Sequence, residues 1–210
     1  MGMQIFTIRR EQGRLGEIAR LVRHFVEERG AGAAWRPGLA LIYADLDRLA
    51  EARTEFERLA SDDFVAVPRD ALWQTCLCYL VEVCDRLHDQ ARAAVLHDLL
   101  QPYHEQTVVV GNATVCLGAT SRFLGQLAAT MGRWDLAESY FRHALELNDR
   151  MQAAPWVAHT RFQYARMLLR RAAPADAARA AGLLAQAGAA ATDLGMQGLA
   201  ARIAGAAGTS

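Results

Sequence analysis

The sequence predicts an all-α fold made of antiparallel helix hairpins that stack side by side. Two observations predict it: the composition and an internal repeat. The 210 residues are 52% hydrophobic and 22% charged, and all 23 basic residues are Arg. Ala and Arg favour helices, whereas Ile and Thr, which favour strands, are scarce. A chain of this length can form one domain with a substantial core.

The internal repeat is a spacing of small and large apolar residues. In three copies a small or apolar residue is followed by Ala twelve positions later, and a large side chain follows four positions after that Ala. A small residue lets a neighbouring helix approach closely, and the large one fills the groove beside it. One hairpin cannot bury its own apolar face, so successive hairpins must stack. The second-helix positions that anchor the pattern recur every 34 to 44 residues at Ile18, Ala52, Ala93, Ala137 and Ala180.

These anchors divide the chain into about four to five repeats within a single domain over residues 1–207. Tight turns are predicted at Gly13-Arg14, Asp47-Arg48, His88-Asp89 and Gly132-Arg133. For Thr107–Val110 the alternatives are a short extended edge, the opening of the next helix and, as we expect, an ordered connector into a helix that starts near Ala113. The predicted hairpins cover residues 4–29, 34–61, 70–101, 113–151 and 155–194, and a short capping helix covers 197–207.

The copy from Leu124 to Ala144 reads L-G-x2-A followed by G-x-W-x2-A-x3-F-x2-A. This pattern resembles the tetratricopeptide repeat. The longer spacings, together with Ile8–Leu15 and Val108–Gly111, resemble the C-terminal arrays of large bacterial signal-transduction proteins. Those proteins carry an AAA ATPase module joined either to an adenylate/guanylate cyclase or to a LuxR-type DNA-binding region. The resemblance implies a right-handed solenoid and a regulatory role in the cytoplasm, and it brings no catalytic residue with it.

Charge and residue usage exclude several functional classes. Acidic and basic residues balance at 23 each, which argues against nucleic acid or an anionic membrane as the main partner. The absence of Lys excludes a phosphate-binding P-loop, a protein-kinase core and Schiff-base chemistry. The longest uncharged stretch, over 107–121, is too short to span a membrane.

The cysteines predict neither disulfides nor a metal centre. Cys76 and Cys78 point to different sides of a helix, so they cannot share a metal ion. We expect free thiols, no metal and no cofactor. The four cysteines are Cys76, Cys78, Cys84 and Cys116.

The resemblance implies that the first helix of each hairpin lines a concave groove. Helical spacing then gives the candidate binding residues. Three of them, Arg122, Arg166 and Arg170, would hold a carboxylate through paired hydrogen bonds, and two acidic residues would make the opposite end negative. The alternative interpretation is that these positions are solvated faces of amphipathic helices. The candidates are Thr75, Cys78, Glu82, Asp85, Arg86, Arg122, Gln126, His159, Phe162, Arg166 and Arg170.

Three hypotheses for function follow. The first is a non-catalytic protein–protein interaction module, an arm of a signalling ATPase or cyclase that docks a peptide or partner helix in the groove. The second is a small-ligand sensor or enzyme subunit in which the Arg cluster and His159 bind an anionic metabolite. The third is the regulatory arm of a LuxR-type transcriptional regulator. An open groove favours docking, and a closed pocket favours a sensor. We also expect the N-terminal end to expose Ile5, Phe6 and Ile8 and to favour self-association.

Overall fold

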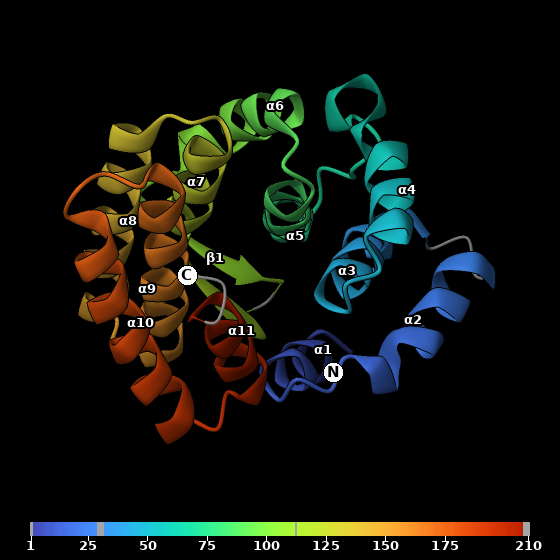
Figure 1. The fold of residues 1–210 in the computed structure, drawn as a ribbon. Coiled ribbons are helices and arrows are strands. Elements are labelled where there is room, and N and C mark those ends of the chain that lie inside the picture. Colours follow the sequence, from blue (N-terminus) through green and yellow to red (C-terminus); the bar gives the residue numbers. More distant parts are fainter. Residues whose placement is uncertain (1, 29–31, 112, 208–210) are drawn as a thin grey trace.

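The computed structural model describes residues 2–28, 32–111 and 113–207. Within these ranges the chain forms eleven α-helices, two short 3-10 segments (61–64 and 101–103) and one two-stranded sheet, so the prediction of a mostly helical protein is confirmed (Figure 1). The helices are α1 (Gly2–Glu11), α2 (Gly16–Glu28), α3 (Gly32–Asp45), α4 (Leu49–Ala60), α5 (Trp73–Leu87), α6 (Gln90–Leu100), α7 (Thr120–Thr130), α8 (Trp134–Arg150), α9 (Ala154–Arg171), α10 (Asp176–Asp193) and α11 (Gln197–Ala207).

The helices form a ring with two layers. The odd-numbered helices lie on the inside of the ring and the even-numbered helices lie on the outside (Figure 1). From α2 to α11 each helix packs on the next, and α1 contacts α11, so the two ends of the helix series meet and close the ring. This closure brings residues near the N-terminus beside residues some 190 positions later.

The all-α prediction misses a β-hairpin. Strand β1 (Thr107–Val110) pairs antiparallel with β2 (Val115–Ala119), and α7 begins only at Thr120. The predicted connector and the predicted hairpin start at 113 are therefore wrong. The physical reason is the β-branched run Thr-Val-Val-Val, which favours an extended chain and buries Val108 and Val110. The hairpin contacts α1, α5, α7, α8 and α9.

Small residues mark the close contacts between the two layers. Ala52, Ala93, Ala137 and Ala180 are all fully buried. Gly125 of α7 faces Phe141 of α8, and a Cβ added to Gly125 would lie 2.9 Å from the Phe141 ring. The repeat motif thus has a direct packing role, because the ring occupies the space that any larger residue at 125 would need.

We expect Gly125→Ala to destabilise the protein by about 1–2 kcal/mol, because crowding of Phe141 outweighs the gain in helix propensity. Gly182→Ala is the matched control, since a Cβ at Gly182 meets nothing within 4 Å. That control should be neutral or stabilising by up to about 1 kcal/mol. Urea unfolding of both variants measures the difference, and equal stabilities would contradict the packing argument.

The N-terminal helix is covered more than the sequence predicts. Phe6 is buried and contacts the ring of Tyr79, whereas Ile5 and Ile8 are exposed. The self-association expected from this end stays a prediction. Among the helices that the structure describes, none is both long and apolar enough to cross a membrane.

Candidate functional site: a charged central cavity

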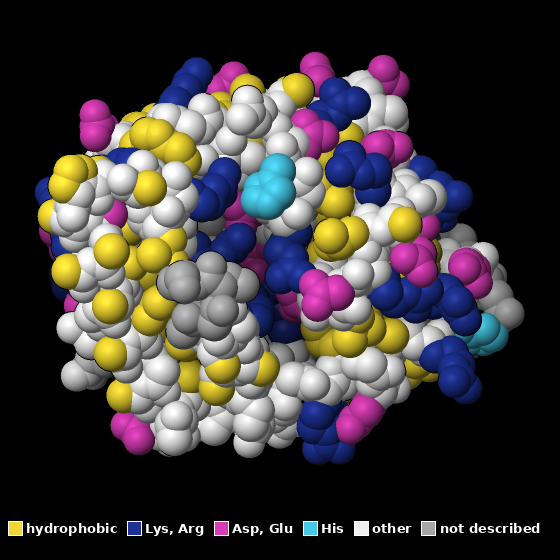
Figure 2. All heavy atoms as spheres, viewed as in Figure 1, with side chains coloured by type: hydrophobic (Ala, Val, Ile, Leu, Met, Phe, Trp, Pro, Cys, Tyr) yellow, Lys and Arg dark blue, Asp and Glu magenta, His cyan; other side chains and the backbone are white. Residues whose placement is uncertain are grey.

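The inner helices surround a cavity of about 520 Å³. Figure 2 shows it as a hollow near the centre of the molecule, with Arg and acidic side chains in its wall. Its charged residues come from α1, α3, α5, α9 and α11 and from the turn after α3. The polar lining residues are Arg10, Asp45, Asp47, Glu82, Asp85, Arg86, Gln126, Gln163, Arg166 and Arg202, and Phe162 and Leu15 contribute apolar surface.

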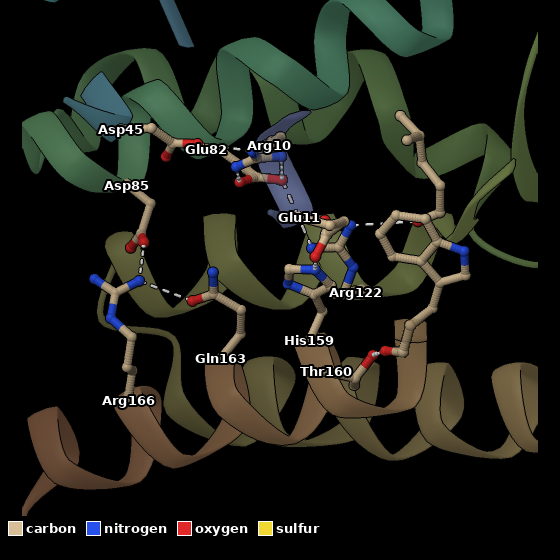
Figure 3. Close-up of polar contacts among 12 residues, drawn as sticks. Arg10, Glu11, Asp45, Glu82, Asp85, Arg122, His159, Thr160, Gln163 and Arg166 are labelled. Carbon is tan, nitrogen blue, oxygen red and sulfur yellow. Dashed lines mark hydrogen bonds and ion pairs between the residues drawn. The ribbon is translucent and has the colours of Figure 1, made fainter. Parts of the chain in front are cut away.

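Arg10 joins three helices in the wall of this cavity. Its Nε donates to Asp45 Oδ2 at 2.7 Å, and its two terminal nitrogens donate to the two carboxylate oxygens of Glu82 (Figure 3). Arg122 Nη1 lies 3.7 Å from the same Glu82 carboxylate. Burial alone would raise the pKa of Glu82, but Arg10 and Arg122 hold it well below its usual range. Glu82 therefore stays ionised and links α1, α5 and α7.

Asp85 is the centre of a second group of charges. Arg166 Nη1 donates to Asp85 Oδ2 at 2.7 Å, and Arg170 Nη1 donates to Oδ1 at 3.1 Å. The hydroxyl of Thr130 donates to Oδ1 at 3.3 Å, and Arg166 also donates to the amide oxygen of Gln163. These contacts tie α5 and α7 to α9 across the inside of the ring.

Glu11 and His159 connect the first helix to α9. His159 Nε2 lies 3.0 Å from both carboxylate oxygens of Glu11, and the imidazole stacks on Trp156. Burial lowers the pKa of His159, although Glu11 opposes that effect. The imidazole is thus neutral near pH 7 and donates Nε2–H to the carboxylate. Burial would raise the pKa of Glu11, but the contact with His159 lowers it to about 2.

These shifts predict that acid weakens the fold in two stages. The unfolded chain protonates its His near pH 6.5, which buried His159 resists, so stability falls as the pH drops below about 6.5. A second loss follows between about pH 4.5 and 2, where Glu11 protonates more readily in the unfolded chain. Urea unfolding between pH 8 and 4 measures the first stage. His159→Gln should remove the loss that begins just below pH 6.5, and stability that rises on acidification would contradict the assignment.

The structure brings together some of the candidates predicted from sequence and separates others. Six of them line the cavity: Glu82, Asp85, Arg86, Gln126, Phe162 and Arg166. Behind these, Arg122, His159 and Arg170 form ion pairs or hydrogen bonds. The remaining two do not reach the cavity. Cys78 is fully buried, and Thr75 borders a much smaller cleft beside Phe6 and Tyr79.

Two expectations about charge are corrected. The predicted Arg cluster is not free to grip a ligand, because Arg166 and Arg170 both contact Asp85 and Arg122 lies beside Glu82. Glu82 and Asp85 also do not form a separate acidic end, because both are paired with Arg side chains. Helical projection placed these residues on inward faces, but it could not show that facing helices lie close enough for the charges to pair.

Sequence reasoning missed Arg10, Asp45 and Arg202. Arg10 and Asp45 lie in the last turn of a first helix, the same place that Asp85 and Arg170 occupy in later hairpins. A charged residue at this position in several hairpins could therefore have identified Arg10 and Asp45 as inward-facing residues. Arg202 lies on α11, which reads from sequence as a capping helix only, and its inward position depends on ring closure.

Among the described residues, no cysteine lines the cavity, and its acidic side chains are not placed to hold a metal ion together. Burial raises the pKa of Cys76 to about 12 and that of Cys78 and Cys84 well above its usual range, so these thiols stay protonated. Across 2–28, 32–111 and 113–207, no three His, Cys, Asp or Glu side chains are placed to hold a metal ion.

No protein-family model matches the chain, and no curated protein gives a significant match. The function proposed below therefore rests on the geometry of the cavity and on the repeat pattern.

Proposed function

We propose that this chain is a non-catalytic regulatory module, a tetratricopeptide-like solenoid closed into a ring, that binds a small effector in its central cavity. The observation that carries the proposal is where the inward-facing residues of α5 and α9 lie. Glu82, Asp85, Phe162 and Arg166 line one central cavity together with Arg10 and Arg202, and this cavity is partly open to solvent.

The size of the cavity favours a small molecule over a peptide. Small-ligand sites have volumes of roughly 300–1,000 Å³, a range that includes this cavity. A docked helix with its side chains is about 10–12 Å across, and it needs a groove open at both ends. Residues of α1 and α11, which contact each other, both line the cavity, so its wall includes both ends of the helix series. Of the sequence hypotheses, the small-ligand sensor therefore has the stronger support.

The same features support a regulatory role without catalysis. The charged groups facing the cavity are held largely in ion pairs, which suits a rigid recognition surface. An effector that contacts several inner helices would stabilise the closed ring, and a protein partner bound to the outside would then sense the change. The resemblance to regulatory arrays of bacterial signalling ATPases and cyclases is in accord with this arrangement.

A cavity-filling variant tests the proposal. Ala201 lines the cavity, whereas Ala204, one turn along the same helix, is exposed and does not. Ala201→Trp fills part of the space, and Ala204→Trp is the matched control. A panel of charged and neutral small molecules is screened by thermal shift and confirmed by calorimetry. We expect some compounds to stabilise the wild type and Ala204→Trp but not Ala201→Trp. Equal responses in both variants, or no response from any compound, would reject the cavity as the effector site.

A further inference from the structure

Among the described residues that line the cavity, one guanidinium has no acidic partner within 4 Å. Four Arg and four acidic side chains line the cavity. Arg10 takes two of the acids, Asp45 and Glu82, and the other two pair with Arg86 and Arg166. Because one Arg serves two carboxylates, each lining acid is satisfied and a lining Arg remains.

That remaining residue is Arg202 of α11. Within the described residues it makes no hydrogen bond and no ion pair within 4 Å, and its guanidinium lies 5.7 Å from the centre of the Phe162 ring. Burial lowers its pKa, an effect that Asp45 and Glu82 oppose from a longer distance. Arg202 is half-buried and its guanidinium stays charged, as guanidinium groups do in proteins, so an anion that enters the cavity meets a cation with no acidic partner within 4 Å among the described residues.

Gln126 is a second unsatisfied group in the same wall. Its side chain is only 2% exposed, and neither its amide nitrogen nor its amide oxygen has a hydrogen-bond partner in the described chain. Buried amides are almost always hydrogen-bonded, so an orphan amide in a cavity wall points to a missing partner. Gln126 offers one donor group and one acceptor, which suits a hydroxyl, keto or amide group.

Building on the proposed function, we infer that the effector is a small organic monocarboxylate, whose carboxylate binds Arg202 and whose neutral polar group hydrogen-bonds Gln126. A guanidinium fits a carboxylate through two parallel N–H···O bonds. A single negative charge completes the pairing with Arg202, so inorganic phosphate, which is a mixture of the singly and doubly charged ions at neutral pH, fits less well. Phe162 supplies an apolar surface for the carbon skeleton.

Calorimetric titration of the full chain tests this inference. The probes are small monocarboxylates that carry a hydroxyl, keto or amide group, their uncharged primary amides, and inorganic phosphate. The variants are Arg202→Gln and, as a matched control, Arg150→Gln at an exposed site on outer helix α8. We expect a carboxylate to bind the wild type and Arg150→Gln equally, and Arg202→Gln about 10- to 100-fold more weakly.

The outcomes separate this inference from the proposed function. The inference fails if a neutral amide binds as tightly as its carboxylate, or if Arg202→Gln keeps full affinity. The proposed function still stands in that case, provided that Ala201→Trp abolishes binding. Phosphate binding more tightly than every carboxylate would also overturn it. If no probe of any charge binds, and no compound of the broader panel tested with Ala201→Trp binds either, both the inference and the proposed function are rejected.

Gln126→Leu gives a second measurement that does not depend on Arg202. Removing an amide without partners should leave the free protein at least as stable, because no hydrogen bond is lost. The same change should weaken carboxylate binding several-fold. A purely structural role for Gln126 predicts the reverse, a less stable protein with unchanged affinity, and that result would contradict the assignment.

Discussion

Replacing Glu82 with Gln is expected to remove about 3–5 kcal/mol of stability, the loss typical of breaking a buried ion pair by removing one partner. Arg10 would keep Asp45, but Arg122, which is only 2% exposed, would lose its carboxylate partner. Against a typical total of about 5–15 kcal/mol, such a loss leaves the fold marginal. Urea unfolding at pH 7.5 measures it.

Two further variants make the result specific. Glu146→Gln changes an exposed acid on α8 and should alter stability by no more than about 0.5 kcal/mol. Glu82→Gln combined with Arg122→Met removes both charges, and should be more stable than Glu82→Gln alone. If the double variant is the weaker of the two, the cost does not come from the stranded guanidinium.

The second large effect is expected from Gly198→Ala, which should open the ring. A Cβ at Gly198 would clash with the carbonyl oxygen of Arg10 and lie 3.1 Å from the amide nitrogen of Gly13. Backbone on both sides cannot move aside as a flexible side chain could. We expect a loss of about 2–3 kcal/mol and faster hydrogen exchange, confined first to α1 and α11.

The control for ring opening lies on the same helix. A Cβ at Gly205 meets nothing within 4 Å, so Gly205→Ala should keep the exchange protection of α1. Ligand binding gives an independent readout, because separation of α11 from α1 moves Arg202 away from the cavity. Unchanged protection of α1 in Gly198→Ala would show that the two helices do not depend on each other.

The helical nature of the chain could be predicted because its signals are local. Ala-rich segments, tight turns and the 125–144 motif each depend on neighbours within one hairpin. The β-hairpin was missed because the β-branched run at 107–110 is short, and its partner strand, Val115–Ala119, contains a single β-branched residue. Whether two such segments pair depends on tertiary packing, which the periodicity of the sequence does not reveal.

The site was predicted in part, and the reason is geometric. A helical projection identifies which residues face inward, so Glu82, Asp85, Gln126 and Arg166 could be named. It does not give the distance between helices that are far apart in sequence, and therefore missed that Asp85 contacts Arg166 and Arg170. Arg202 could not be assigned at all, because nothing local to α11 indicates that it meets α1.

The meeting of α1 with α11 also affects how the chain folds during synthesis. In a linear array, early hairpins can form while later ones are still being made, because each touches only its neighbours. Here Glu11 contacts His159, and the backbone of Arg10 lies against Gly198, so these contacts can form only after α9 and α11 have been synthesised. Such long-separation contacts slow folding. The first helix can pack on α5 early, through Phe6 and Tyr79, but its contacts with α9 and α11 can form only after those helices have left the ribosome.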